Sequence, residues 1–269
     1  MKIVITRREE DSESLVKASK EAGLESLCFP CLEITEPSDD YKSLDDVIRK
    51  NHLYDWVFFL SRNAADAFFS RLIEIGGQFF NLAPHLKIAV IGSSTASFIK
   101  NEVGFPVNFI PSKFNSDSFV KEFLENYSDP KPLPGTEKQK LLLVRAELDD
   151  DGFKERIEAT EEFELDTALA YKTKIPDSYD LEALKAFLDD DSSDRYISFA
   201  SSETVRNFKE MTKTLDLSQY LKGIFLLSIG PKTSQAIKEE FSELDLSNIL
   251  LEAEEATLES VLKCLYARR

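Results

Sequence analysis

The chain has 269 residues, long enough for two modest domains, and its 42% hydrophobic content can support a substantial core. The formal net charge of −16 argues against generic nucleic-acid binding and against binding to anionic membrane surfaces, because both need a basic face. Three cysteines provide no disulfide framework, and two histidines lack metal-ligand spacing, so we expect no metal site.

Short apolar runs alternate with amphipathic segments along the chain, which is typical of an α/β protein. The first part is predicted to contain a strand at 2–5, a helix capped by Asp11 or Ser12 and ended by Gly23, a strand at 24–29 and an extended piece at 31–37. The last part is predicted to contain a helix at 181–188, strand–turn–helix segments around Ser201 and Gly230, a strand at 249–252 and a helix at 257–266.

The middle of the chain has the same alternation. Its first half is predicted to contain a helix at 42–51, a strand beginning at Asp55, a helix beginning near Asn63, a strand at 88–90 and a helix ended by Gly104. Its second half is predicted to contain a strand at 107–110, a helix at 116–127 capped by Ser116, a turn-rich loop at 129–135, a strand at 140–145, a helix at 152–160, a strand beginning at Phe163 and a second extended piece at 168–174.

Two strand–turn–helix segments occur twice in the same order. Segment 229–238 repeats the Ile, Gly, Thr, Ile and Lys positions of segment 91–100. Segment 194–205 resembles segment 55–65, again as an apolar strand, a Ser-bearing turn and a helix. Chance could explain either match alone, but their common order and spacing favour a duplicated α/β domain.

The amino-terminal pair of strands has too few partners for a sheet of its own, so we expect it to join the last part of the chain. One domain is then discontinuous, and the two extended pieces connect it to an inserted domain as a two-stranded linker. We predict two similar domains, each a parallel sheet flanked by helices: a discontinuous one at 1–32 and 176–269, and an inserted one at 38–166, with linker strands at 33–37 and 167–175.

Hydroxyl side chains recur where predicted strands end and helices begin, as at Ser61 and its counterpart Ser201. Parallel α/β sheets bind ligands at the carboxyl ends of their strands, and the free N–H groups of a helix start attract anions. Helix capping alone would also explain each serine and threonine. Arg7 follows the first strand and is either an anion contact or an ordinary surface arginine.

Familiar catalytic sets are not visible in the sequence. We find no Ser-His-Asp or Cys-His set, and the glycines form neither a GxGxxG motif nor a P-loop. Cys28 and Cys31 form a CxxC pair, but the Phe-Pro between them ends a strand rather than beginning a helix, which disfavours a redox role. No signal peptide or bilayer-length apolar run is visible, so we expect a cytoplasmic protein.

The order and spacing of these motifs resemble the uroporphyrinogen-III synthase family over essentially the whole chain. The resemblance is carried by Ile5-Thr6-Arg7-Arg8, segment 55–65, Ala89-Val90-Ile91-Gly92 with Thr95-Ala96, Leu142-Leu143-Val144-Arg145, Ala170-Tyr171-Lys172-Thr173, Phe199-Ala200-Ser201, Ile229-Gly230 with Thr233, and Ala253 with Thr257. It implies two similar α/β domains joined by a two-stranded linker, in agreement with the layout above.

The resemblance also implies an activity. The family takes hydroxymethylbilane, a linear tetrapyrrole with eight carboxylates, and closes it with inversion of ring D through a spiro intermediate, releasing water without a cofactor. The expected partners are this substrate and, for a transient hand-over, hydroxymethylbilane synthase. We expect a monomer that binds neither nucleic acid nor membrane. The alternative is a non-enzymatic two-domain sensor for a tetrapyrrole or another polyanion.

The resemblance assigns site residues as well. Tyr171 matches the linker tyrosine proposed to assist loss of the hydroxyl, although it could instead pack the linker against a domain. Glu203 stands where the inserted domain has Asn63, and we expect its carboxylate to point away from a polyacid. The predicted substrate-binding residues are Thr6, Arg7, Ser61, Asn63, Gly92, Ser94, Thr95, Ser198, Ser201, Ser202, Gly230, Lys232 and Thr233.

Overall fold

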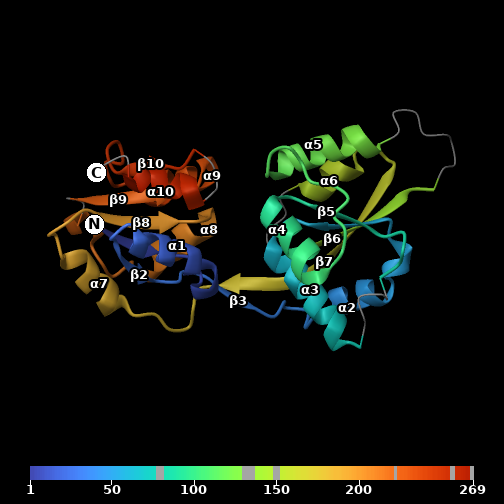
Figure 1. Ribbon diagram of the computed structural model, residues 1–269, viewed down its shortest axis with the longest axis horizontal. Helices are drawn as coiled ribbons and strands as arrows, with labels where there is room; N and C mark the ends of the chain where they lie inside the picture. Colours follow the sequence, from blue (N-terminus) through green and yellow to red (C-terminus); the bar gives the residue numbers. More distant parts are fainter. Residues whose placement is uncertain (77–81, 129–136, 148–151, 221–222, 255–257, 267–269) are drawn as a thin grey trace. The chain divides into compact units, whose positions relative to one another are not determined.

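The computed structural model describes residues 1–76, 82–128, 137–147, 152–220, 223–254 and 258–266 (Figure 1). The chain divides into two compact units, which we call unit 1 (Met1–Glu33 with Lys174–Arg269) and unit 2 (Ile34–Thr173). Each unit has one five-stranded sheet with helices packed on it. The predicted fold class is therefore confirmed: two similar α/β units, of which the first is discontinuous.

Unit 1 contains a sheet with the strand order β10-β9-β8-β1-β2. Its strands are β1 (Lys2–Ile5), β2 (Glu25–Cys28), β8 (Arg195–Phe199), β9 (Ile224–Ser228) and β10 (Leu250–Glu252), and its helices are α1 (Glu9–Glu21), α7 (Leu181–Asp189), α8 (Ser202–Met211), α9 (Pro231–Glu240) and α10 (Leu258–Tyr266), with a 3₁₀ turn at Leu217–Tyr220. All four strand pairs are parallel. The carboxyl ends of these strands therefore lie at one edge.

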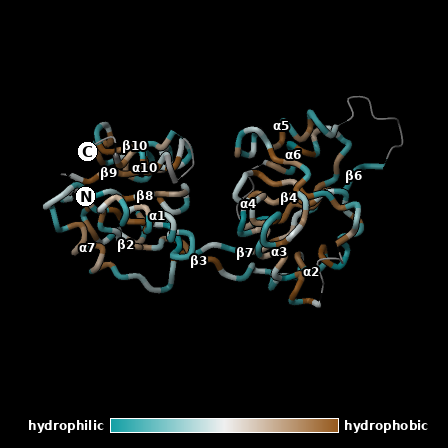
Figure 2. The backbone as a smooth tube through the Cα atoms, in the orientation of Figure 1, coloured by the Kyte–Doolittle hydropathy of each residue, from teal (hydrophilic) through white to brown (hydrophobic). Residues whose placement is uncertain are grey.

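The core of unit 1 lies on both faces of its sheet. Ile3 and Ile5 pack in one cluster with residues of α1 and α10, whereas Val4 packs in another with residues of α7, α8 and α9. This alternation follows from the two-residue period of a strand. Figure 2 shows hydrophobic residues concentrated along the strands, with mixed colouring along the helices. A strand covered on both faces explains the continuous apolar runs in the sequence.

Unit 2 contains a sheet with the strand order β3-β7-β6-β4-β5. Its strands are β3 (Glu33–Thr35), β4 (Trp56–Phe59), β5 (Lys87–Val90), β6 (Gln139–Ala146) and β7 (Phe163–Lys174), and its helices are α2 (Lys42–Arg49), α3 (Arg62–Glu74), α4 (Ser93–Phe98), α5 (Ser116–Tyr127) and α6 (Phe153–Glu158), with a 3₁₀ turn at Asn51–Leu53 and a π-helical turn at Ile99–Val103. The strands β7, β6, β4 and β5 pair in parallel.

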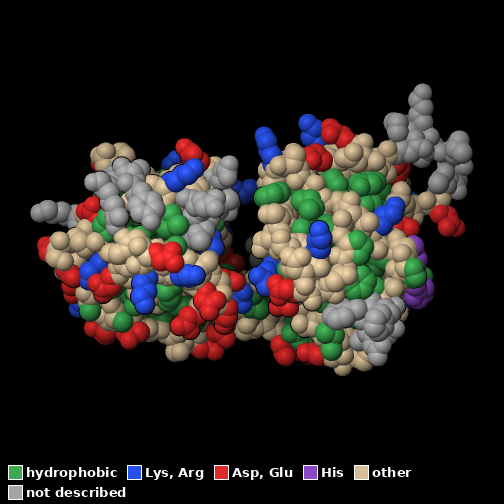
Figure 3. Space-filling view, in the orientation of Figure 1, with side chains coloured by type: hydrophobic (Ala, Val, Ile, Leu, Met, Phe, Trp, Pro, Cys, Tyr) green, Lys and Arg blue, Asp and Glu red, His purple; other side chains and the backbone are tan. Residues whose placement is uncertain are grey.

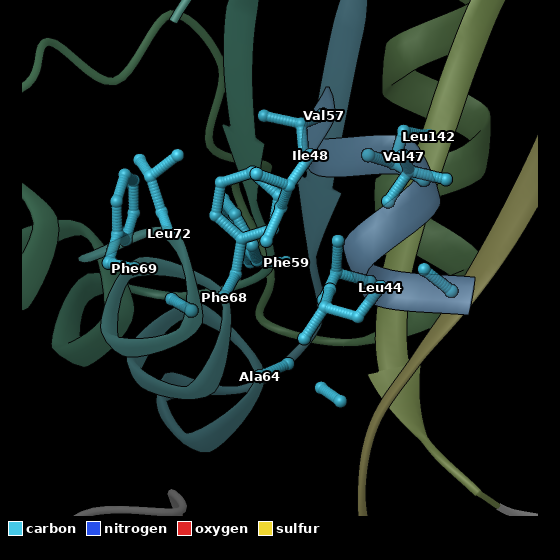
Figure 4. Packing of buried hydrophobic residues seen from close by; sticks show 14 of the residues in the cluster. Leu44, Val47, Ile48, Val57, Phe59, Ala64, Phe68, Phe69, Leu72 and Leu142 are labelled. Carbon is cyan, nitrogen blue, oxygen red and sulfur yellow. The ribbon is translucent and has the colours of Figure 1, made fainter. Parts of the chain in front are cut away.

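The two faces of the unit 2 sheet are packed differently. Phe59 of β4 lies with Leu44 of α2 and Phe68 of α3 in one cluster (Figure 4). Phe58 faces the other side, where its ring meets that of Phe123 edge to face with centroids 4.8 Å apart. Such aromatic pairs add about 0.5–1.5 kcal/mol each beyond their buried area. Strand β4 is therefore packed on both faces.

Two predicted helix caps are wrong by a few residues. Helix α1 begins at Glu9 with Arg8 before it, and Ser12 lies inside the helix, where its hydroxyl donates to the Arg8 carbonyl at 2.6 Å. Helix α5 is capped by Asn115, whose side chain accepts from the Ser118 N–H, rather than by Ser116. Helix α1 therefore begins without a side-chain cap, whereas α5 uses the cap-forming residue just before the predicted one.

Other differences concern extended segments. Segment 107–110 is not a strand, because only Phe109 forms a bridge, to Ala89 of β5. The extended piece at 168–174 is not separate from the strand beginning at Phe163, since β7 runs through both. The predicted loop at 129–135 lies outside the described residues.

Candidate functional site

The carboxyl edge of each sheet carries the turns that the sequence analysis singled out. In unit 1 this edge bears Thr6 after β1, the Ser201 turn after β8 and the Gly230 turn after β9. In unit 2 it bears Ser61 after β4 and Gly92 after β5. Parallel pairing alone brings these residues to one edge within each unit.

The starts of α8 and α9 are tied together in unit 1. Ser201 caps α8, with its Oγ accepting from the Thr204 N–H at 3.1 Å, and Thr204 completes a capping box by accepting from the Ser201 N–H. The Ser202 hydroxyl donates to the carbonyl of Lys232 at 3.0 Å. Gly230 precedes α9. Two helix starts therefore lie side by side at this edge, with the Lys232 side chain exposed.

The first turn of α9 and the strand ends beneath it are buried. Thr233 is only 4% exposed, and the Ser234 hydroxyl beside it has no hydrogen-bond partner among the described residues. Thr6 is fully buried, and its hydroxyl donates to the carbonyl of Ser198 at 2.7 Å. This hydrogen bond links the end of β1 to β8, so the hydroxyl hydrogen of Thr6 is already engaged within the protein. The buried Ser198 lies within β8 itself.

Arg7 differs from its neighbour Arg8. Among the described residues, the Arg7 guanidinium has no hydrogen bond or ion pair, whereas Arg8 pairs with Asp11 at 2.8 Å. Burial lowers the pKa of Arg7, and the charge of Asp11 partly offsets this effect. A half-buried guanidinium with unused donors at a strand's carboxyl end suits a carboxylate, which it can bind through two parallel N–H donors.

Tyr171 and Ser61 meet at the carboxyl edge of unit 2. The Ser61 Oγ lies 3.2 Å from the Tyr171 Oη and also accepts from the Ala64 N–H at 3.1 Å as the cap of α3. The pairing of β6 with β7 shifts register between Arg145 and Ala146, so that Ala146 pairs with Tyr171. Bulges of this kind re-aim side chains near the end of a strand.

Tyr171 combines a buried ring with a hydroxyl that contacts another side chain. Its side chain is 8% exposed and belongs to the hydrophobic cluster that contains Phe59 and Val144. Its hydroxyl nevertheless reaches Ser61 at the edge of the sheet. A buried ring fixes the position of a phenol that is still close to the protein surface.

The turn after β5 combines a glycine, hydroxyls and an aromatic ring. Gly92 has extended backbone angles, Thr95 is buried and Ser94 is exposed. A side chain at Gly92 would touch the ring of Phe114 at 3.5 Å, and that ring is 60% exposed. Sequence reasoning missed Phe114, although a single aromatic within the polar segment 112–118 was a usable signal. Asn63 is half-buried in the first turn of α3.

Charged side chains of both signs are spread over the visible face of each unit (Figure 3). Among the described residues, no group of three or more His, Cys, Asp or Glu side chains could hold a metal ion. The burial of the Cys31 thiol raises its pKa, which suits a structural rather than a reactive cysteine. No helix in the described part of the chain is both long and apolar enough to cross a membrane.

Comparison with known proteins agrees with the geometry. The profile of the family described as uroporphyrinogen-III synthase HemD matches residues 13–263. A uroporphyrinogen-III synthase from Synechococcus elongatus is 31% identical over 268 residues, covering 97% of this chain and 92% of that protein. The alternative of a non-enzymatic sensor is not favoured by these matches.

Solved structures show the same fold. A mutant uroporphyrinogen III synthase from Thermus thermophilus superposes with a TM-score of 0.62 at 15% identity, covering 99% of this chain and 98% of that one. The uroporphyrinogen-III synthetase from Helicobacter pylori gives a TM-score of 0.57 at 15% identity, covering 100% and 99%. The family match over nearly the whole chain, together with these folds, shows that the chain belongs to the uroporphyrinogen-III synthase family.

Proposed function

We propose that this protein closes hydroxymethylbilane to uroporphyrinogen III, inverting ring D, as a cyclising hydro-lyase that needs no cofactor. The observation that carries this proposal is the family match over residues 13–263. The reaction is a net loss of water with no change of oxidation state. It therefore requires a group that assists departure of a hydroxyl and a surface that fixes the substrate's conformation.

The chemistry proceeds in three steps. The C–O bond of the ring A hydroxymethyl group breaks, and the oxygen leaves as water after gaining a proton. Ring D then attacks the electrophilic carbon through its substituted position and forms a spiro intermediate. That intermediate rearranges and loses a proton to give the inverted macrocycle. Tyr171 assists the first step, because a phenol can donate a hydrogen bond to the departing oxygen.

Selection between isomers depends on how the substrate is held. Unassisted closure joins the ends without inversion, and a ~1000-fold preference for the inverted product needs roughly 4 kcal/mol of differential stabilisation. Holding a flexible chain in one folded pose can supply this through orientation. The reaction therefore calls for many anchoring contacts rather than for a nucleophile.

Each unit offers such contacts at its own carboxyl edge. Arg7 binds a carboxylate of the substrate, and the starts of α8 and α9 offer backbone N–H groups. Each exposed helix-start contact contributes about 0.3–1 kcal/mol. Phe114 offers an apolar face to a pyrrole beside Gly92. Local donors of this kind let a chain of net charge −16 hold a polyacid.

We further propose that segments 33–37 and 167–175 connect the two units and that the enzyme acts as a cytoplasmic monomer, receiving its substrate from hydroxymethylbilane synthase. The test of function couples the purified protein to enzymatic production of hydroxymethylbilane and separates the product isomers. We expect the type III isomer. Formation of the type I isomer alone would refute the proposed function, and tight binding without turnover would favour a sensor.

A further inference from the structure

We propose that Glu122 is a positioning residue, which holds the loop at 110–115 in place and so fixes the ring of Phe114 for contact with a pyrrole of the substrate. We call residues 110–115 the Phe114 loop. The inference rests on the proposed function, because it adds a supporting residue to the contact between Phe114 and a pyrrole. It begins from the two hydrogen bonds that join the Glu122 carboxylate to Ser112 in this loop.

The first step of the argument is the direction in which the chain enters the Phe114 loop. Phe109 forms a parallel bridge with Ala89 of β5, and the Val90 N–H donates to the Phe109 carbonyl at 3.0 Å. Because this segment runs in the same direction as β5, the residues after Phe109 continue past the carboxyl end of that strand. The loop and the Gly92 turn therefore lie together at the carboxyl edge of unit 2, where the Phe114 ring is next to Gly92.

The second step is the exposure of the apolar side chains in the loop. Ile110 is 41% exposed and Phe114 is 60% exposed, whereas Pro111 is buried. Single exposed apolar residues are ordinary on protein surfaces, but here two large ones lie within five residues of each other. A phenylalanine with most of its surface in water contributes little to the free energy of folding. Its flat apolar face suits the face of a pyrrole ring, since aromatic rings pack favourably on one another.

The third step is the way in which the loop is fixed on both sides of the ring. On one side, the Glu122 carboxylate of α5 accepts from the Ser112 N–H at 2.8 Å with one oxygen and from the Ser112 hydroxyl at 2.6 Å with the other. On the other side, the Asn115 side chain caps α5 by accepting from the Ser118 N–H at 2.9 Å. Phe114 therefore lies between two residues that are both bonded to the same helix.

The contact between Glu122 and Ser112 has a consequence for substrate binding. Hydrogen bonds to an ionised carboxylate are stronger than those between neutral groups. The bonds from the Ser112 hydroxyl and N–H favour the charged form and hold the pKa of Glu122 below its usual range. A ring that is already fixed in place loses less conformational freedom when a ligand contacts it. Release of the loop should therefore weaken substrate binding and leave the chemical step unchanged.

The experiment compares Glu122→Ala, Glu122→Gln and Ser112→Ala with the wild type, and combines Glu122→Ala with Phe114→Ala. Glu125→Ala is the matched control, because it removes the same charge from the same helix and leaves the bonds to Ser112 intact. The carboxylate of Glu125 is exposed and lies 3.9 Å from the Lys121 ammonium. The kcat, KM and product isomer are measured for each protein, and hydrogen exchange of the Phe114 loop is followed by mass spectrometry.

We expect Glu122→Ala to raise KM about two- to fivefold, and no more than Phe114→Ala does, with kcat within about twofold. Charge alone predicts the opposite sign, since removing a carboxylate favours a polyanionic substrate, so Glu125→Ala should have a KM at or slightly below that of the wild type. Glu122→Gln and Ser112→Ala each keep one of the two hydrogen bonds and should give intermediate KM values. In the Phe114→Ala background, Glu122→Ala should not raise KM further. The amides of the loop should exchange at least about threefold faster in Glu122→Ala than in Glu125→Ala.

Two failures are distinguishable. A wild-type protein that makes no type III isomer refutes the proposed function, and the assignment of Glu122 falls with it. A wild-type protein that makes this isomer, while Glu122→Ala has the same KM as Glu125→Ala, refutes the assignment of Glu122 alone, even if the loop exchanges faster. A further rise in KM when Glu122→Ala is added to Phe114→Ala would also overturn the assignment, because Glu122 would then act through another residue.

Discussion

Replacing Tyr171 by phenylalanine removes one oxygen atom from the candidate site and leaves the ring that fills the core. The ring is nearly buried and stays in contact with the cluster around Phe59, so the change creates no cavity. Ser61 loses one hydrogen-bonding partner but still accepts from the Ala64 N–H. We therefore expect the free energy of unfolding to change by less than about 1 kcal/mol.

The expected effect on the reaction is much larger than the effect on stability. A hydrogen bond to an oxygen that develops charge contributes about 1.5–3 kcal/mol. Loss of such a bond in the transition state lowers kcat by about 10- to 150-fold. The substrate's carboxylates are held elsewhere, so KM should stay within about twofold.

The assay follows type III isomer formation with coupled hydroxymethylbilane production, and urea unfolding gives the stability of the same protein. A low kcat with normal KM and normal stability supports a direct role for the phenol. Unchanged turnover would remove Tyr171 from the mechanism. A raised KM with unchanged kcat would instead make it a binding residue, and the reasoning about the departing hydroxyl would be refuted.

Arg7→Gln should raise KM about tenfold or more, because it removes a charge-assisted contact with a substrate carboxylate. Arg8→Gln should change KM less, because Arg8 is already paired with Asp11. Equal effects of the two substitutions on KM would contradict the proposed contact between Arg7 and a carboxylate. Phe114→Ala should raise KM about two- to tenfold without changing the unfolding midpoint, because the ring is exposed. The Arg71 guanidinium holds the pKa of Asp45 below its usual range, so their contact stabilises the fold fully above about pH 4 and is lost as pH falls through the folded-state pKa. Urea unfolding of Asp45→Asn should therefore show a deficit against the wild type that shrinks below about pH 4, and a deficit independent of pH would refute this account.

Most of the helices and strands predicted from sequence patterns follow from interactions between residues close together in the chain. A buried strand followed by a serine and an amphipathic segment predicts a capped helix wherever it occurs, and Ser61 and Ser201 both cap helices. The candidate residues at strand ends also follow from pattern, because parallel strands must place their carboxyl ends together. Segment 107–110 has an apolar pattern too, but prolines at 106 and 111 remove N–H donors on both sides of it.

The choice of helix cap and the contacts of single aromatic rings could not be predicted in this way. Arg8 precedes α1 although two better cap-forming residues follow it, and Ser12 instead donates to the Arg8 carbonyl within the helix. Phe114 lies against Gly92 from a segment more than twenty residues further along the chain. That contact depends on which neighbours the folded chain provides.

The sequence by itself determined that the chain forms two related α/β units with polar turns at their strand ends. The alternation of strands with helices and the residues of the turns are local features of the sequence, and the duplication is visible as repeated segments. Only the tertiary structure decided which distant residues meet. Thr6 bonds Ser198 across 192 residues, and Ser61 meets Tyr171 across 110. The first contact depends on the pairing of β1 with β8, and the second on the strand order of unit 2, where the pairing of β6 with β7 shifts register between Arg145 and Ala146.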